Sequence, residues 1–305
     1  MLDATRTAPR YPVPVQRPVP RLWPRVLALA VALVAAAGVH LTWRIFVASE
    51  AGQRVDGLAL AGAEHGQYRL WTVAEPVLDV VSVAFVVAGI AAAMTVALVR
   101  RRWALALQVA VLVGGANLTT QVLKYAVYDR PHLLPGWSGP NTLPSGHTTV
   151  AASVALALLL AAPRAWRPAV AALGAIWTAA TGVSTLVGQW HRPSDVVAGV
   201  LVVLAWGGAV CAFGSRSSLD VLEGPGGRRS GSVVVATLLA AVGAATGFVA
   251  FGALDGARGG AWSDLPLAGD VTAYAGGVAG VVAVTAVAFA VILVVRQATA
   301  RPEPD

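Results

Sequence analysis

Long apolar runs separated by short polar segments make up most of this 305-residue chain. A helix needs about 20 apolar residues to cross the hydrocarbon layer of a membrane, and eight runs come close to that length. They lie at 26–43, 77–99, 103–122, 148–162, 169–187, 196–213, 233–253 and 271–295. The fourth run is short, but it becomes long enough if its helix begins inside the preceding Pro-Ser-Gly-His turn. The pattern predicts an all-α fold, a polytopic transmembrane helical bundle of about eight spans.

The polar segments between the runs predict how the chain is divided. Residues 1–24 are rich in proline and arginine and cannot bury a core, so a disordered cytoplasmic tail is expected there. A Gly-, Ser- and Arg-rich cytoplasmic loop at 214–232 separates a six-span core, 25–213, from two additional transmembrane helices at 233–296. Residues 297–305 form a second cytoplasmic tail.

The basic residues predict the orientation, because short loops rich in arginine and lysine stay on the cytoplasmic side. Of the 22 lysines and arginines, 15 fall in the two tails and in alternate loops. Both termini are therefore predicted to be cytoplasmic, in a multi-pass protein of the cell (inner or plasma) membrane. The remaining loops are predicted to lie outside.

Composition and charge narrow the class of protein. With 57% hydrophobic and only 12% charged residues, the chain is unlike an ordinary soluble domain. The net charge of +7 is interpreted as an orientation signal and as attraction to anionic membrane lipids. Nucleic acid is not an expected partner, because no soluble basic domain is present to bind it. Cys211 is the single cysteine, which excludes a disulfide within the chain, and no feature indicates an oligomeric state.

Three polar motifs stand at the ends of apolar runs on the predicted outer side. The first, Lys124 to Pro131 (KYAVYDRP), contains the only lysine of the chain. Pro131 ends helical geometry, so Lys124 and Arg130 face the outer loop, where an ammonium and a planar guanidinium can bind phosphate oxygens. Taken alone, this pair is equally typical of interfacial anchors.

The second motif is Pro144 to His147 (PSGH). Ser145 is expected to cap a helix, and Gly146 permits close approach to the backbone. The free N–H groups of the first helical turn then form an anion site, with His147 beside it. A plain capping turn with an interfacial histidine is the alternative interpretation.

The third motif is Ser184 to Asp195 (STLVGQWHRPSD). Pro193 suits the first position of a helix, and Asp195 suits its first turn. A carboxylate hydrogen-bonded to one ring nitrogen of His191 would leave the other nitrogen free for nucleophilic attack. Alternatively, Asp195 only caps the helix.

A metal site with His147, His191 and Asp195 as ligands is the alternative to an anion site. Zinc sites favour tightly spaced histidines and cysteines, and the neighbouring cations Lys124 and Arg130 would repel a metal ion. The basic surroundings favour an anion.

In this order the three motifs resemble the signature of the type 2 phosphatidic acid phosphatase superfamily, the lipid phosphate phosphatases related to vanadium haloperoxidases. The resemblance implies that His191 is a nucleophile forming a phosphohistidine, that Asp195 orients it, and that His147 is the general acid. It also implies that no metal or other cofactor takes part. The residues that would bind the phosphoryl oxygens are Lys124, Arg130, Ser145 and Gly146.

Two departures from that signature are visible. Five residues separate Lys124 from Arg130, where the family usually has six. Thr185 stands where the third motif normally has a phosphate-binding arginine, and the loss of one charge-assisted contact weakens transition-state stabilisation. Arg192 is the candidate replacement for that charge.

The expected function is hydrolysis of a phosphate monoester or diphosphate of an amphiphilic substrate at the outer face of the membrane. The substrate classes are polyprenyl phosphates and glycerolipid phosphates, and the residues do not choose between them. Two alternatives stay open: a phosphotransferase with an acceptor other than water, and a catalytically impaired lipid-binding or transport protein marked by Thr185. A haloperoxidase is disfavoured for so apolar a chain.

Overall fold

The computed structural model describes residues 21–65, 67–80, 83–99, 101–135, 139–215, 219–220, 231–257 and 269–301. Within these residues the chain forms ten α-helices and no strand. Residues 1–20 of the predicted N-terminal tail lie outside the described residues. Most of the predicted loop at 214–232 and residues 302–305 also lie outside them.

Ten α-helices and two π-helical turns, η1 and η2, follow one another along the chain. They are α1 (Leu22–Thr42), η1 (Trp43–Val47), α2 (Glu50–Gly62), α3 (Gln67–Val80), α4 (Val83–Val99), α5 (Trp103–Val122), η2 (Leu123–Val127), α6 (Gly146–Ala161), α7 (Arg167–Val187), α8 (Pro193–Ala212), α9 (Ser232–Ala257) and α10 (Gly269–Thr299).

Six of these helices are long and apolar enough to cross a membrane. They are α1 with η1, α5 with η2, α7, α8, α9 and α10. Two shorter apolar helices, Val87–Val99 and Gly146–Ala161, match the remaining predicted runs. The chain is thus an all-α, multi-pass membrane protein, which confirms the fold class predicted from the apolar pattern.

The boundaries of the second predicted span were wrong. Val77–Val80 end α3, and the next described helix begins at Val83. The apolar pattern continues from one helix into the next, so it did not reveal where α3 stops. The sequence interpretation also treated residues 44–76 as an outer loop, whereas most of this segment is helical in η1, α2 and α3.

Helix α6 lies at the centre of the bundle. Twelve of its 16 residues are buried, and most of them are alanine, leucine, serine or threonine, which let neighbouring helices approach closely. The main hydrophobic cluster joins residues of α1, α4, α5, α6, α8 and α10. Helices α1 and α8 approach each other closely at a glycine, because a Cβ at Gly208 would stand only 2.7 Å from the carbonyl oxygen of Ala28.

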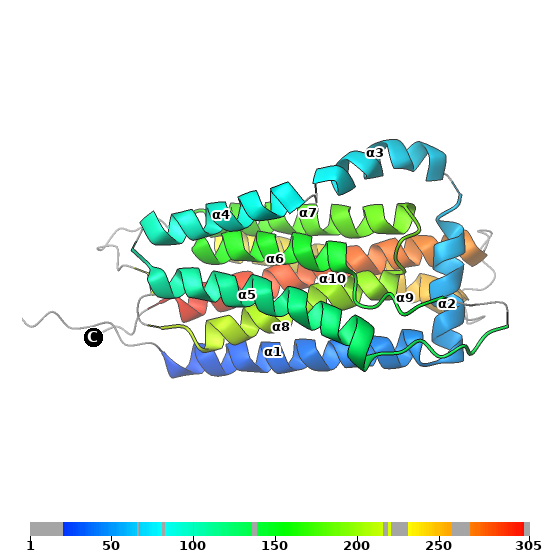
Figure 1. Cartoon of the computed structure of the whole chain (residues 1–305), viewed down its shortest axis with the longest axis horizontal. Coiled ribbons are helices and arrows are strands. Elements are labelled where there is room, and N and C mark those ends of the chain that lie inside the picture. The colour runs from blue at the N-terminus through cyan, green and yellow to red at the C-terminus, as the bar shows by residue number, and fades with distance from the viewer. Residues whose placement is uncertain are drawn as a thin grey trace, which may run out of the picture.

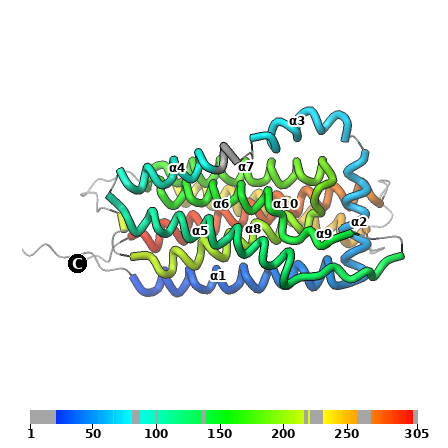
Figure 2. The backbone as a smooth tube through the Cα atoms, in the orientation of Figure 1, coloured from blue at the N-terminus to red at the C-terminus, as the bar shows by residue number. Residues whose placement is uncertain are grey.

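The two described ends of the chain lie at one end of the bundle, and α2 lies across the opposite end (Figure 1). The connection that follows α5 runs past α2 and returns to the start of α6 (Figure 2). Since α7 delivers the chain to the same end before α8 begins, all three polar motifs meet beside α2.

Candidate active site

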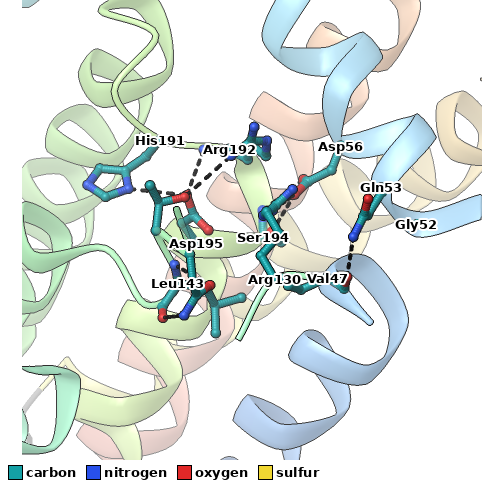
Figure 3. A network of polar contacts seen from close by, with 12 residues as sticks. Val47, Gly52, Gln53, Asp56, Arg130, Leu143, His191, Arg192, Ser194 and Asp195 are labelled. Atoms are coloured by element: carbon teal, nitrogen blue, oxygen red, sulfur yellow. Dashed lines mark hydrogen bonds and ion pairs between the residues drawn. The ribbon is translucent and has the colours of Figure 1, made fainter. Parts of the chain in front are cut away.

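His191 and Asp195 form a buried pair at the start of α8. Their side chains are 7% and 0% exposed, and Nδ1 of His191 lies 3.2 Å from Oδ2 of Asp195 (Figure 3). The same oxygen accepts hydrogen bonds from the hydroxyl of Thr142 at 2.7 Å and the backbone N–H of Arg192 at 3.0 Å. With Nδ1 facing the carboxylate, Nε2 of His191 is the nitrogen left to react.

His147 lies beside this pair, in the first turn of α6. Its ring centroid lies 6.2 Å from that of His191, with the two planes at 67°. On the other side, the ring of Trp190 lies 5.3 Å away, and Trp190 in turn meets Trp71 of α3 edge-on at 5.9 Å. The structure thus brings together the two histidines that the motifs singled out, and adds an aromatic neighbour that sequence reasoning had missed.

Ser145 caps α6, as its position in the motif predicted. Its hydroxyl oxygen accepts hydrogen bonds from the backbone N–H and the hydroxyl of Thr148, at 3.4 and 3.0 Å. Its own N–H donates to the carbonyl of Asp195 at 2.8 Å, which couples the starts of α6 and α8. Gly199 of α8 makes this approach possible, because a Cβ there would lie only 2.9 Å from the carbonyl oxygen of Ser145.

Open space lies next to Gly146. A Cβ built on this residue would meet no heavy atom within 4 Å. The N–H groups of a first helical turn have no partner within the helix. The Ser145 hydroxyl accepts from Thr148, which leaves the N–H groups of Gly146 and His147 available to an anion on this side. The sequence motif predicted that Gly146 permits close approach to the backbone, and the open space beside it is compatible with that prediction.

Arg130 is buried, and its hydrogen-bonding groups are unused. Its side chain is 6% exposed, and none of its three guanidinium nitrogens has a hydrogen-bond partner among the described residues. It forms an ion pair with Asp56 of α2, at 3.8 Å. Burial and the nearby Arg192 lower the pKa of Arg130, and Asp56 acts in the opposite direction. A buried guanidinium without hydrogen bonds is costly unless a ligand satisfies it.

Lys124 lies in η2 and is half-buried. It is close enough to Asp195 and His147 to interact with both electrostatically. Asn141, which sequence reasoning had missed, fixes this segment: its side-chain N–H₂ lies within 3.2 Å of the carbonyls of Lys124, Tyr128 and Leu143. The two cations of the first motif are thus held by the loop that leads to the second.

Asp56 is the largest omission of the sequence interpretation. It is fully buried in α2, and its carboxylate accepts hydrogen bonds from the N–H and hydroxyl of Ser194 at 3.3 and 2.6 Å. Burial, followed by the negative charge of Asp195, raises the pKa of Asp56 from 3.8 to about 7. One signal was present, because Ser49 is a residue type that caps helices and its side chain accepts from the N–H of Gly52 at the start of α2.

Thr185 and Arg192 occupy different surroundings. The hydroxyl of Thr185 donates to the carbonyl of Gly182 at 2.7 Å, and its own carbonyl accepts the N–H groups of Trp190 and His191. Thr185 therefore supports the turn before His191. Arg192 reaches Thr142, with Nη1 at 3.4 Å from the hydroxyl oxygen, so it stands beside the Asp195 carboxylate.

Metal ligands do not cluster in the described part of the chain: no three His, Cys, Asp or Glu side chains there gather around a common point. Metal independence stays a prediction that a chelator can test.

The arrangement suits a tetrahedral oxyanion. Two imidazoles lie close together, and a buried carboxylate orients one of them. An ammonium, a guanidinium and a helix N-terminus supply positive potential. The structure brings the predicted site residues to one end of the bundle, and their chemical roles stay predictions.

In a comparison with known families, the family model described as the PAP2 superfamily matches residues 103–218. This stretch runs from α5 to just beyond α8 and contains all three motifs. No curated protein and no solved structure matches the chain.

Proposed function

We propose that the protein is a membrane phosphatase acting on lipid-like phosphate esters, because residues 103–218 match the family model described as the PAP2 superfamily. Members of that superfamily are generally phosphatases. The observation that carries the proposal is the pairing of His191 with Asp195 at 3.2 Å, with the ring of His147 centred 6.2 Å away. Binding alone would require no such imidazole pair.

In the proposed reaction, Nε2 of His191 attacks the phosphorus atom in line with the leaving alcohol. The P–O bond to the alcohol breaks, and His147 in its protonated form gives that alkoxide a proton. A water molecule then attacks the phosphohistidine while His147 takes up its proton. Inorganic phosphate leaves, and both histidines return to their starting states. Asp195 holds the imidazole of His191 and stabilises its positive charge.

The phosphoryl oxygens are assigned to Lys124, Arg130 and the first turn of α6 after Ser145, including Gly146. Arg130 supports this assignment best, because its buried guanidinium has no hydrogen-bond partner. Arg192 is proposed to replace the charge missing at Thr185. Unchanged turnover after Arg192→Ala would reject that part of the proposal.

We place the site at the outer face of a cell membrane, with both termini in the cytoplasm. The excess of basic residues at the tails favours this orientation, and the described chain ends lie at the opposite end of the bundle from the motifs (Figure 1). The substrate is proposed to be a polyprenyl or glycerolipid phosphate or diphosphate, whose apolar tail stays in the membrane.

The test is phosphate release by purified protein in detergent, with a chelator present. Short-chain phosphatidate and farnesyl diphosphate represent the two substrate classes. His191→Ala should reduce release about 1,000-fold or more, as expected for loss of a nucleophile. His65→Ala is the matched control, because His65 is an exposed histidine at the end of α2.

The alternatives give different results. Equal release by wild type and His191→Ala would favour a lipid-binding or transport protein. Release that falls when an alcohol or sugar acceptor is added, with phosphate appearing on the acceptor, would indicate a phosphotransferase. A radiolabelled phosphoenzyme that survives alkali, is lost in acid and is absent from His191→Ala would identify the phosphohistidine.

A further inference from the structure

Helix α2 presents two buried polar side chains to the Arg130 segment. Gln53 and Asp56 are three residues apart, so they lie on the same face of the helix, and each is only 2% exposed. The amide of Gln53 donates to the carbonyls of Val47 and Pro131 at 2.7 and 2.6 Å. Asp56 faces Arg130, the residue before Pro131, at 3.8 Å. One helix thus contacts both the backbone and the guanidinium of this segment.

Asp56 also contacts the first turn of α8. Ser194, which donates two hydrogen bonds to its carboxylate, directly precedes Asp195 in the chain. The same carboxylate therefore touches the segment that carries the nucleophile and the segment that carries Arg130 (Figure 3).

Asp56 also borders a small cavity of about 70 Å³. The cavity is lined mostly by apolar residues and glycines, together with Thr42 and Ser194, and Asp56 is its one charged lining residue. The charged groups that interact with the carboxylate are Arg130, Arg192 and Asp195, all on the site side. A buried carboxylate is costly without such partners, so its contacts with the site offset that cost.

We propose that Asp56 is a positioning residue for the phosphate site, which fixes the guanidinium of Arg130 relative to the start of α8. The inference deepens the proposed phosphatase function and rests on it for the nature of the ligand. Asp56 itself touches no reacting atom. Its ion pair at 3.8 Å leaves all three guanidinium nitrogens of Arg130 without hydrogen bonds, and these are then available to phosphoryl oxygens.

A positioning role predicts a particular kinetic pattern. Asp56→Asn keeps an oxygen that can accept from Ser194 but loses the ion pair with Arg130. The turnover number should fall about tenfold, the size of one coupled pair of charged groups. KM should not rise, because removing a negative charge does not weaken the ground-state attraction for an anion. Vanadate, which mimics the transition state of phosphoryl transfer, should bind about tenfold more weakly.

The deciding experiment is a double-mutant cycle between Asp56→Asn and Arg130→Ala, measured both as kcat/KM and as the Kd of vanadate by titration calorimetry. If Asp56 acts through Arg130, Asp56→Asn should change either quantity by less than about twofold when Arg130 is already alanine. A merely structural defect would lower kcat/KM and raise the Kd of vanadate by the same factor in either background. Such additivity would overturn the proposal. Glu50→Gln, an exposed substitution on the same helix, is the matched control and should change nothing.

The two readouts separate this inference from the proposed function. Vanadate binding without hydrolysis would contradict the phosphatase proposal, and the cycle in Kd would still test Asp56. If the protein hydrolyses lipid phosphates but the effects of Asp56→Asn and Arg130→Ala are additive, only the role of Asp56 would be contradicted. A wild-type protein that neither hydrolyses lipid phosphates nor binds vanadate would contradict both.

Discussion

The two buried carboxylates near His191 have different partners, and this difference gives them different expected behaviour. Asp195 Oδ2 faces three groups, His191 Nδ1, the hydroxyl of Thr142 and the N–H of Arg192. Asp56 has Ser194 and a more distant Arg130. Asp195 is therefore held as the charged acceptor of a hydrogen-bond network, whereas Asp56 ionises only near neutral pH.

Asp195→Asn should lower kcat about 1,000-fold, because an amide cannot accept from every donor around Oδ2 and no longer fixes the tautomer of His191. The measurement is steady-state hydrolysis of a short-chain lipid phosphate. Thr142→Ala removes one donor from the same oxygen and should cost much less. Equal losses in the two variants would mean that Asp195 acts mainly by holding the loop.

Asp56 should make stability depend on pH. Its pKa is raised to about 7 by burial and by Asp195, so between about pH 4 and 7 the folded protein keeps a proton that the unfolded chain releases. Stability should consequently be highest on the acidic side of this window and fall as the pH rises through 7. Melting temperatures of wild type and Asp56→Asn across that range test the sign. The difference between them should change with pH only within the window.

At the scale of helices, the apolar pattern predicted the helices that are apolar enough to be buried in a membrane. The run at 103–122 corresponds residue for residue to α5. Helix α6, which contains the fourth apolar run, begins in the Pro-Ser-Gly-His turn, as the short length of that run required. Helix α2 escaped prediction because it crosses the end of the bundle instead of spanning it, and its buried face carries Gln53 and Asp56. Polar residues on a buried face give no apolar periodicity to detect.

The same reasoning explains what was predictable in the site. His147, His191 and Asp195 lie within short motifs at helix starts, where local geometry already constrains them. The contact of Asp56 with Ser194 joins residues 138 positions apart, and no local rule indicates it. Arg130 could be predicted as a cation of the site, but its lack of hydrogen-bond partners appears only once the bundle is assembled.

Gln53 offers a test of how firmly α2 is attached. Gln53→Ala leaves the buried carbonyls of Val47 and Pro131 without this donor, and each lost hydrogen bond of this kind costs about 1 kcal/mol. We expect a loss of about 2 kcal/mol in the free energy of unfolding, measured by denaturation in detergent. The neighbouring Arg54→Ala removes an exposed ion pair with Glu50 and should cost less than about 0.5 kcal/mol.

Across the whole molecule, charged groups gather at both ends of the bundle. Opposite the site, Asp220 makes a two-point contact with Arg167 at 2.9 and 2.7 Å and lies 3.7 Å from Arg102. Although burial raises the pKa of Asp220, hydrogen bonds and charge from Arg167 hold it below its ordinary value. Arg296 of α10 is buried nearby and donates to the carbonyl of Leu160. This carboxylate therefore links the ends of α5 and α7 close to the end of α10.

Asp220→Asn should destabilise the fold by about 3 kcal/mol, the usual cost of leaving buried charges without their partner. The wild-type contribution should be present at neutral pH and disappear as the pH falls through the lowered pKa of Asp220. Denaturation of the variant at neutral pH measures the loss, with the exposed Glu50→Gln as control. Because the substitution lies at the far end of the bundle, the KM for lipid phosphate should stay unchanged.

The positions of the two polar ends make membrane orientation testable on the intact protein. Cys211 is buried in α8 and is the only cysteine, so Cys211→Ser gives a background free of reactive thiols. Asp129→Cys places a thiol on the exposed segment beside the site, and Ala165→Cys places one between α6 and α7 at the other end.

In whole cells, a maleimide that cannot cross membranes should label Asp129→Cys and should reach Ala165→Cys only after permeabilisation. The reverse pattern would put the phosphate site in the cytoplasm, where it could not act on lipids of the outer leaflet. The excess of arginines in the two tails and in alternate loops predicts the same orientation independently of any motif. The labelling result therefore tests the topology without depending on catalysis.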